Sequence, residues 1–281
     1  MASTLKRFST LVLLVIGILA VFLGYPQLAE TWPRVSLFDI FDTVTILGSI
    51  AVVAGGFRLL RKSDWYLSVL LGVGMGIGAS FATLYSPFPY LGLVRTLHGM
   101  ALIHGLFTCL ACLGGLVVMR SGGPVLFRGA NREYHRFARS LGFGLLIGLP
   151  LAVINVFALQ LTQGHGISWQ SPLSAILDAL QPAILEEMLY RFAFLGLMWM
   201  LLRRQLPEQA AWISGLLALL VHNYAHLSDL IISAPLTALG MGAVMALLWG
   251  FPETILALRR DLESAAAFHW MQDAVRFLVG F

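Results

Sequence analysis

The chain has 281 residues, of which 58% are hydrophobic and only 11% are charged, and its mean hydropathy is +0.83. Soluble domains carry about 25% charged residues, so this composition excludes an ordinary soluble enzyme. The formal net charge of +4 gives no indication of a nucleic-acid partner, because most basic residues fall in short loops between apolar blocks.

Long apolar blocks follow one another along the whole chain, and each is close to the length needed to cross roughly 30 Å of hydrocarbon. Blocks of this length predict helices, since only helices and closed barrels satisfy their backbone hydrogen bonds in lipid. We therefore expect an all-α polytopic transmembrane helical bundle with about eight or nine spans and no soluble domain. The expected spans are Phe8–Leu28, Leu37–Leu60, Trp65–Tyr85, Leu93–Met119, Ala138–Leu161, Leu173–Leu202, Gln209–Tyr224, Pro235–Phe251 and Ser264–Phe281.

Basic residues gather on every second loop between these blocks, which indicates a cytoplasmic N-terminus. The pattern predicts an integral protein of a bacterial inner (cytoplasmic) membrane. The residues are Lys6 and Arg7, then Arg58, Arg61 and Lys62, then Arg120, Arg128, Arg132, Arg136 and Arg139, then Arg203 and Arg204, and finally Arg259 and Arg260.

The longest polar stretch, residues 120–139, divides the chain into two parts. Residues 1–130 form an N-terminal membrane region of four helices, to which the sequence assigns no role. Residues 138–281 form a second membrane region, which contains the polar groups that carry a functional hypothesis.

Two adjacent carboxylates and an arginine lie in the apolar stretch Ala183–Phe192. Ionisable groups at bilayer depth are costly and usually mark function. Glu187 and Arg191 are four residues apart on one helix face and can form an ion pair. Glu186 points about 100° away around the helix, so it has no local partner and is a candidate general base.

Two further pairs with the same spacing follow in later apolar blocks, His222 with His226 and His269 with Asp273. His226 is expected close to water, near the end of its block. If the three polar faces meet, then Glu186, His222 and His269 converge on one cavity.

Two chemistries are compatible with carboxylates and histidines in one site. A zinc site would use His222, His269 and a glutamate, with a fourth position left for water. A metal-free hydrolase would use Glu186 and His222 to activate water, with His269 and Asp273 at the oxyanion. The sequence contains no His-Glu-x-x-His zincin motif.

At these positions the sequence resembles the CPBP (CAAX protease and bacteriocin-processing, or Abi) family of intramembrane endopeptidases. Three family motifs occur in order over roughly residues 140–281: Glu-Glu-x-x-x-Arg, Phe-x-x-x-His with Ala218 in place of the phenylalanine, and His-x-x-x-Asn/Asp. The matching residues are Glu186, Glu187 and Arg191 for the first, His222 for the second, and His269 and Asp273 for the third.

The resemblance implies a role for each matching residue. Glu186 and His222 would activate the attacking water, Glu187 and Arg191 would orient that carboxylate, and His269 and Asp273 would polarise the scissile carbonyl. Members have been described both as metalloproteases and as glutamate-dependent, metal-free proteases. We expect no cofactor, with zinc on Glu186, His222 and His269 as the alternative.

The expected function is an intramembrane endopeptidase acting on a membrane-associated, lipidated or processed substrate. Its expected partners are a peptide or protein substrate at the membrane and the lipid bilayer, with no nucleic acid. The alternatives are a catalytically silent membrane scaffold or immunity factor, and a proton-coupled transporter that uses the same buried carboxylates.

Overall fold

The computed structural model describes residues 2–32, 34–84, 89–164 and 166–281, without the side chains of residues 2–7 and 163. Regular secondary structure in these ranges is helical, apart from one isolated β-bridge between Tyr90 and Val94. The expected all-α class is therefore confirmed.

The N-terminal part consists of four helices and two short 3₁₀ turns. They are α1 (Ala2–Thr31), α2 (Leu37–Gly56), η1 (Phe57–Leu59), α3 (Lys62–Ser80), α4 (Leu97–Arg120) and η2 (Gly129–Asn131).

The C-terminal part is more interrupted, and two of its elements are π-helical. They are α5 (Tyr134–Gln163), α6 (Pro172–Asp178), α7 (Leu180–Glu186), the π-helix η3 (Glu187–Phe194), α8 (Leu195–Leu202), α9 (Ala210–Ala225), α10 (Ser228–Ser233), α11 (Pro235–Met245), the π-helix η4 (Ala246–Gly250), α12 (Phe251–Arg259) and α13 (Leu262–Leu278).

Helices occur in all nine expected blocks, with two differences in the C-terminal part. The sixth block is not one helix but the series α6, α7, η3 and α8. The eighth continues past Phe251 to Arg259, because Pro252 falls in the first turn of α12, directly after η4, where the missing N–H is tolerated. The expected end of the third block, Tyr85, lies outside the described residues.

Five helices in the described part of the chain are long and apolar enough to cross a membrane. A count of eight or nine spans is not confirmed. The central series α6–α8 contains four charged residues, and α9 and α13 have only 16 and 17 residues. The five candidate spans are Phe8–Thr31, Leu37–Leu59, Leu97–Arg120, Tyr134–Thr162 and Pro235–Arg259.

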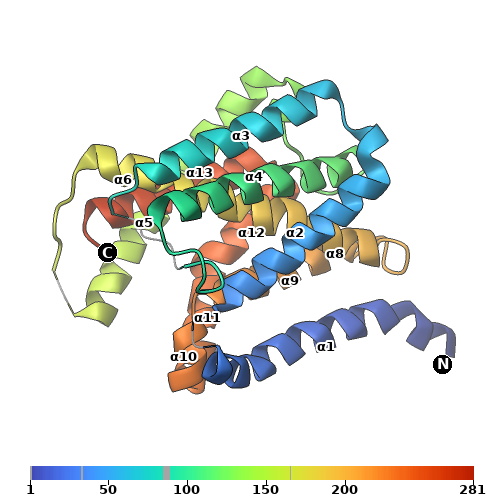
Figure 1. Cartoon of the computed structure of the whole chain (residues 1–281), viewed down its shortest axis with the longest axis horizontal. Coiled ribbons are helices and arrows are strands. Elements are labelled where there is room, and N and C mark those ends of the chain that lie inside the picture. The colour runs from blue at the N-terminus through green and yellow to red at the C-terminus, as the bar shows by residue number, and fades with distance from the viewer. Residues whose placement is uncertain (1, 33, 85–88, 165) are drawn as a thin grey trace.

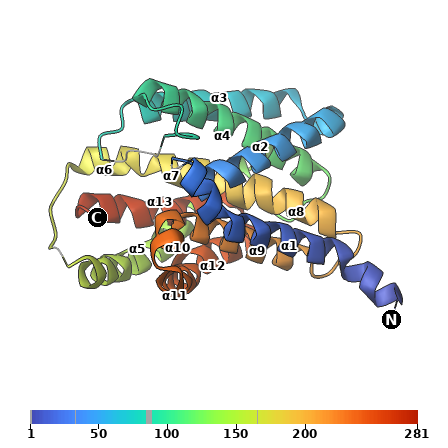
Figure 2. The ribbon, with the colours of Figure 1, turned by 60° about the horizontal axis from the view of Figure 1, so that its bottom comes forward.

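The series α6, α7, η3 and α8 runs through the middle of the molecule, with α3 and α4 on one side and α5 and α13 on the other (Figure 2). Helix α1 lies along the outside (Figure 1). Only 6% of the most apolar window of α1 is buried, against 67% for α4. The N-terminal part therefore contains both the most peripheral span and a central one.

The closest approach between long helices is that of α5 to α13. A Cβ on Gly144 would lie 2.3 Å from the backbone oxygen of Ser264, so only glycine allows this contact. The contact fixes α13, and with it His269, against the rest of the bundle.

Candidate active site

The first polar cluster of the site lies where α7 becomes the π-helix η3. Glu186 ends α7, and Glu187 begins η3, which closes with a bond from the Leu195 N–H to the Tyr190 carbonyl, an i→i+5 pattern. π-Helical turns inside α-helices are frequent at functional sites. Glu186, Glu187 and Arg191 are all buried, as expected for charged groups that face a protein interior.

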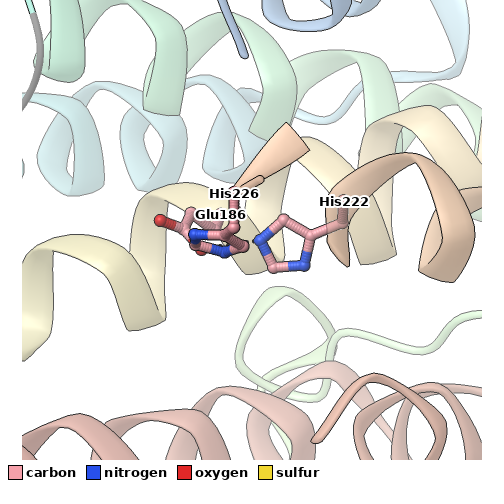
Figure 3. Close-up of side chains that lie close together, drawn as sticks. All are labelled: Glu186, His222 and His226. Carbon is pink, nitrogen blue, oxygen red and sulfur yellow. Dashed lines mark hydrogen bonds and ion pairs between the residues drawn. The ribbon is translucent and has the colours of Figure 1, made fainter. Parts of the chain in front are cut away.

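Glu186 faces three histidines from two other helices. Its Oε2 lies 2.6 Å from Nε2 of His222, 3.6 Å from Nε2 of His226 and 3.9 Å from Nε2 of His269. Figure 3 shows Glu186 beside the two histidines of α9. The expected convergence of Glu186, His222 and His269 is confirmed.

His269, on α13, is surrounded by carboxylates. Its Nδ1 lies 3.1 Å from Oε1 of Glu187 and 3.8 Å from Oε1 of Glu253, and its Nε2 lies 3.4 Å from Oδ2 of Asp273. Because both ring nitrogens face acceptors, a doubly protonated ring satisfies this arrangement. Such a ring is a hydrogen-bond donor in the direction of the cavity.

Arg191 is completely buried and connects His222 on α9 with Glu253 on α12. One terminal nitrogen donates to Glu253 and the other to Nδ1 of His222. Its Nε lies 3.9 Å from Oε1 of Glu187, so the expected pair of Glu187 with Arg191 is present but loose. The closer carboxylate partner of Arg191 is Glu253.

Glu253 was not predicted from the sequence. It lies on α12, two residues beyond the point where the eighth block was expected to end. Glycine at position 250 lets this helix approach α9, because a Cβ there would lie 2.1 Å from Nδ2 of Asn223. A carboxylate two residues after an apolar block of 17 residues was the available signal.

Helix α2 also reaches the site, from outside all three motifs. The Tyr190 hydroxyl donates to Oδ1 of Asp42 at 2.6 Å, and the Tyr190 ring stacks on His222 with centroids 4.5 Å apart and planes at 22°. The ring of Phe38 meets that of His226 edge-on, at 4.7 Å and 84°. The only signal for Asp42 was its place, with Asp39, as one of two carboxylates inside an apolar block.

Asp273 and His226 complete the polar surface. Asp273 forms an ion pair with Arg276, three residues further along α13, with 2.8 Å between Oδ1 and Nη2. His226, expected near water, is the more open of the two α9 histidines, with 38% of its side chain exposed against 4% for His222. It nevertheless faces Glu186, so it belongs to the same cluster.

A cavity of about 530 Å³ opens onto these groups. Its size is within the range of ligand pockets, roughly 300–1,000 Å³. Polar groups occupy one wall, among them Glu186, His269 and Asp273, while apolar side chains cover much of the rest. The apolar wall comes from helices on several sides and includes Ile103, Phe107, Leu159, Val244 and Met245.

Two groups of residues have the composition of a metal site. Glu186, His222 and His226 form one, and Glu187, Glu253 and His269 the other, each with ligand atoms within 4.8 Å of one another. The first contains His226 in place of the His269 expected from the sequence. Arg191 counts against both, because its guanidinium donates to Nδ1 of His222 and to Glu253. As arranged, neither group fits a metal ion.

One of the comparisons with known proteins gives a family match in the C-terminal part of the chain. Residues 168–275 match the family model described as type II CAAX prenyl endopeptidase Rce1-like. The cluster of glutamates, histidines and Arg191 lies in an Rce1-like segment. This match is consistent with the CPBP family, and it covers Glu186, Arg191, His222, Glu253 and His269.

Rce1-like endopeptidases are intramembrane proteases, so the match implies a hydrolase of this general kind. Together with the five apolar helices, it supports an integral membrane protein. Searches of curated proteins and of solved structures found no match to the chain.

Proposed function

We propose that the protein is a glutamate-dependent, metal-free intramembrane endopeptidase that cleaves a membrane-associated or lipidated peptide. The observation that carries the proposal is the contact of one buried carboxylate, Glu186, with three histidines at the edge of a cavity. The Rce1-like match supports the reaction class.

In this mechanism Glu186 is the general base. Its carboxylate accepts a proton from a water in the cavity, and the resulting hydroxide attacks the scissile carbonyl. His222, 2.6 Å away, holds the carboxylate in place. As the tetrahedral intermediate collapses, the same carboxyl group gives the proton to the leaving nitrogen, so that the C–N bond breaks to release an amine. Such proton transfers contribute about 10²–10⁴-fold to a rate.

His269 stabilises the oxyanion. Its Nε2 lies at the cavity lining, 3.9 Å from Oε2 of Glu186 and 3.4 Å from Oδ2 of Asp273. Asp273 and Glu187 orient the ring from its two sides. Donors placed in advance for an oxyanion contribute about 10²–10³-fold each.

The same proposal includes a route for the substrate and an orientation of the protein in the membrane. The substrate would enter along the apolar wall of the cavity, which suits an acyl or prenyl chain or an apolar peptide segment. The basic loops favour a bacterial inner membrane with the N-terminus in the cytoplasm. Eight crossings would require three of α3, the series α6–α8, α9 and α13 to cross as well, and nine would require all four.

The test uses purified full-length protein in lipid nanodiscs and a pair of internally quenched peptides. One peptide ends in a farnesylated Cys-aliphatic-aliphatic-x sequence, and the other is the same peptide without the farnesyl group. We expect cleavage that Glu186→Ala lowers by at least about 10³-fold and that a chelator leaves unchanged.

A matched control is Glu133→Gln, which removes a half-buried carboxylate, paired with Arg128 and Arg136, on the loop before α5. If neither peptide is cleaved, native membranes incubated with active protein and with Glu186→Ala are compared by mass spectrometry of new peptide N-termini. Absence of any difference refutes the protease. Loss of activity with chelator, restored by zinc, refutes the metal-free mechanism.

A further inference from the structure

We infer that Glu253 is a positioning residue that acts through Arg191 to hold His222 in its Nε2–H tautomer. This inference rests on the proposed function for its effect on catalysis. The tautomer itself can be measured whether or not the protein is a protease.

The first step concerns the nitrogen of His222 that faces Arg191. An arginine guanidinium remains protonated in proteins and has donors but no acceptor. Its contact with Nδ1 of His222 therefore requires a lone pair on Nδ1. In a neutral imidazole the proton must then be on Nε2.

The second step concerns the other nitrogen. Nε2 lies 2.6 Å from Oε2 of Glu186, a carboxylate that only accepts when ionised. The Nε2–H tautomer satisfies both contacts of the ring at once. The other neutral tautomer would place an N–H against Arg191 and a lone pair against Glu186, so both contacts would become repulsive.

The third step concerns what holds Arg191. Its side chain is completely buried, and in the described part of the chain its Nε has no hydrogen-bond partner. Glu187 is 3.9 Å away and is already 3.1 Å from His269. Glu253 is therefore the carboxylate that compensates the guanidinium directly and sets its direction.

The consequence is a chain of contacts from Glu253 through Arg191 and His222 to Glu186. With His222 as a fixed donor, Glu186 stays oriented, and its remaining lone pairs are available for water. Nε2 of His222 is then not free to bind a metal ion. Ala218, which replaces the motif phenylalanine, lies on α9 with His222 but is not one of the residues that make these contacts.

The experiment is nitrogen NMR of histidine-labelled full-length protein in nanodiscs, with the His222 signals assigned by their loss in His222→Gln. We expect wild-type His222 to show a protonated Nε2 and an unprotonated Nδ1. In Glu253→Gln we expect a mixture of tautomers and, with the peptide cleaved by the wild type, a kcat about 10–100-fold lower at unchanged KM.

The matched control is Glu263→Gln, which alters another buried glutamate, at the start of α13 and away from the site. It should leave the His222 spectrum and kcat as in the wild type. If Glu253→Gln does not fold, Glu253→Asp replaces it, because the shorter side chain withdraws the carboxylate from Arg191.

Three results overturn the inference. They are a wild-type His222 protonated on Nδ1, a doubly protonated His222, and a folded Glu253 variant with wild-type spectrum and kcat. A wild-type spectrum as expected, in a protein that cleaves nothing, refutes the protease alone and leaves the tautomer assignment intact.

Discussion

Two buried networks of charged side chains differ in how completely their hydrogen bonds are made. At the turn between α12 and α13, both oxygens of Asp261 accept two bonds each. They come from Arg128 and Ser140 on one oxygen, and from the backbone and hydroxyl of Ser264 on the other, at 2.6–3.0 Å. These bonds join the loop before α5, α5 itself and the start of α13.

The network around Arg191 is less complete. The Nε of Arg191 and one oxygen of Glu187 are buried without a hydrogen-bond partner among the described residues, and one side of the cluster faces a cavity. A saturated network has no capacity left to bind a substrate, so its contribution is to stability. An unsaturated network at a cavity retains donors and acceptors for a reacting water and carbonyl.

The largest effect that separates the two networks is expected from His269→Gln. Glutamine can still donate to Glu187, but it cannot replace a doubly protonated ring at an oxyanion. We expect kcat to fall about 10²–10³-fold. The melting temperature should change by no more than roughly 2–4 °C, equivalent to 1 kcal/mol. Peptide cleavage within about threefold of the wild type would contradict the role of this residue.

The opposite result is expected from Asp261→Ala. The change removes the N-cap of α13 and the carboxylate partner of Arg128. Together these should cost about 3 kcal/mol. The melting temperature should then fall by roughly 6–12 °C, with kcat unchanged at a temperature where the variant is folded. Differential scanning fluorimetry measures the first quantity. A thermally unaltered Asp261→Ala would show that this network is not the structural one.

The smallest effect is a pH dependence of stability at the same turn. Burial raises the pKa of Glu263 from 4.5 to about 7, although its Oε1 accepts from the Gly129 N–H. The folded protein therefore holds this proton more tightly than the unfolded chain does. Its stabilising effect is complete below pH 4.5 and is lost as the pH rises through 7, by about 2–3 kcal/mol.

In Glu263→Gln, the melting temperature should depend less on pH between pH 4.5 and 7 than it does in the wild type. The pKa of Asp261 is shifted in the opposite direction, downwards, so Asp261 does not titrate between pH 4.5 and 7. Burial opposes its ionisation, but bonds from Ser140, Ser264 and Arg128 outweigh burial and lower its pKa below 3.8. An unchanged pH profile in Glu263→Gln would contradict the raised pKa of this group.

The sequence predicted the centre of the site because its members are rare. Glu186, His222 and His269 are ionisable groups in apolar blocks, and such groups must find one another in a packed bundle. Their positions on separate helices made convergence a geometric expectation, and their contacts within 4 Å confirm it.

The partner of Arg191 could not be found in the same way. Spacing rules detect neighbours on one helix, so they selected Glu187, four residues away. Glu253 is 62 residues away, and its approach depends on a glycine contact and on a helix that continues through Pro252. The number of membrane crossings could not be predicted from the sequence either. The apolar content of a block does not reveal where the block is divided into α- and π-helical segments.

The contribution of α2 has a consequence for how relatives should be compared. Asp42 and Phe38 touch the site from a helix more than 100 residues before the Rce1-like segment. The portion that homology recognises is therefore smaller than the portion that builds the chemistry. Proteins that share the three motifs but differ in this early helix would keep the same reaction while they diverge in the stiffness of the Tyr190–His222 stack and the shape of the substrate entrance.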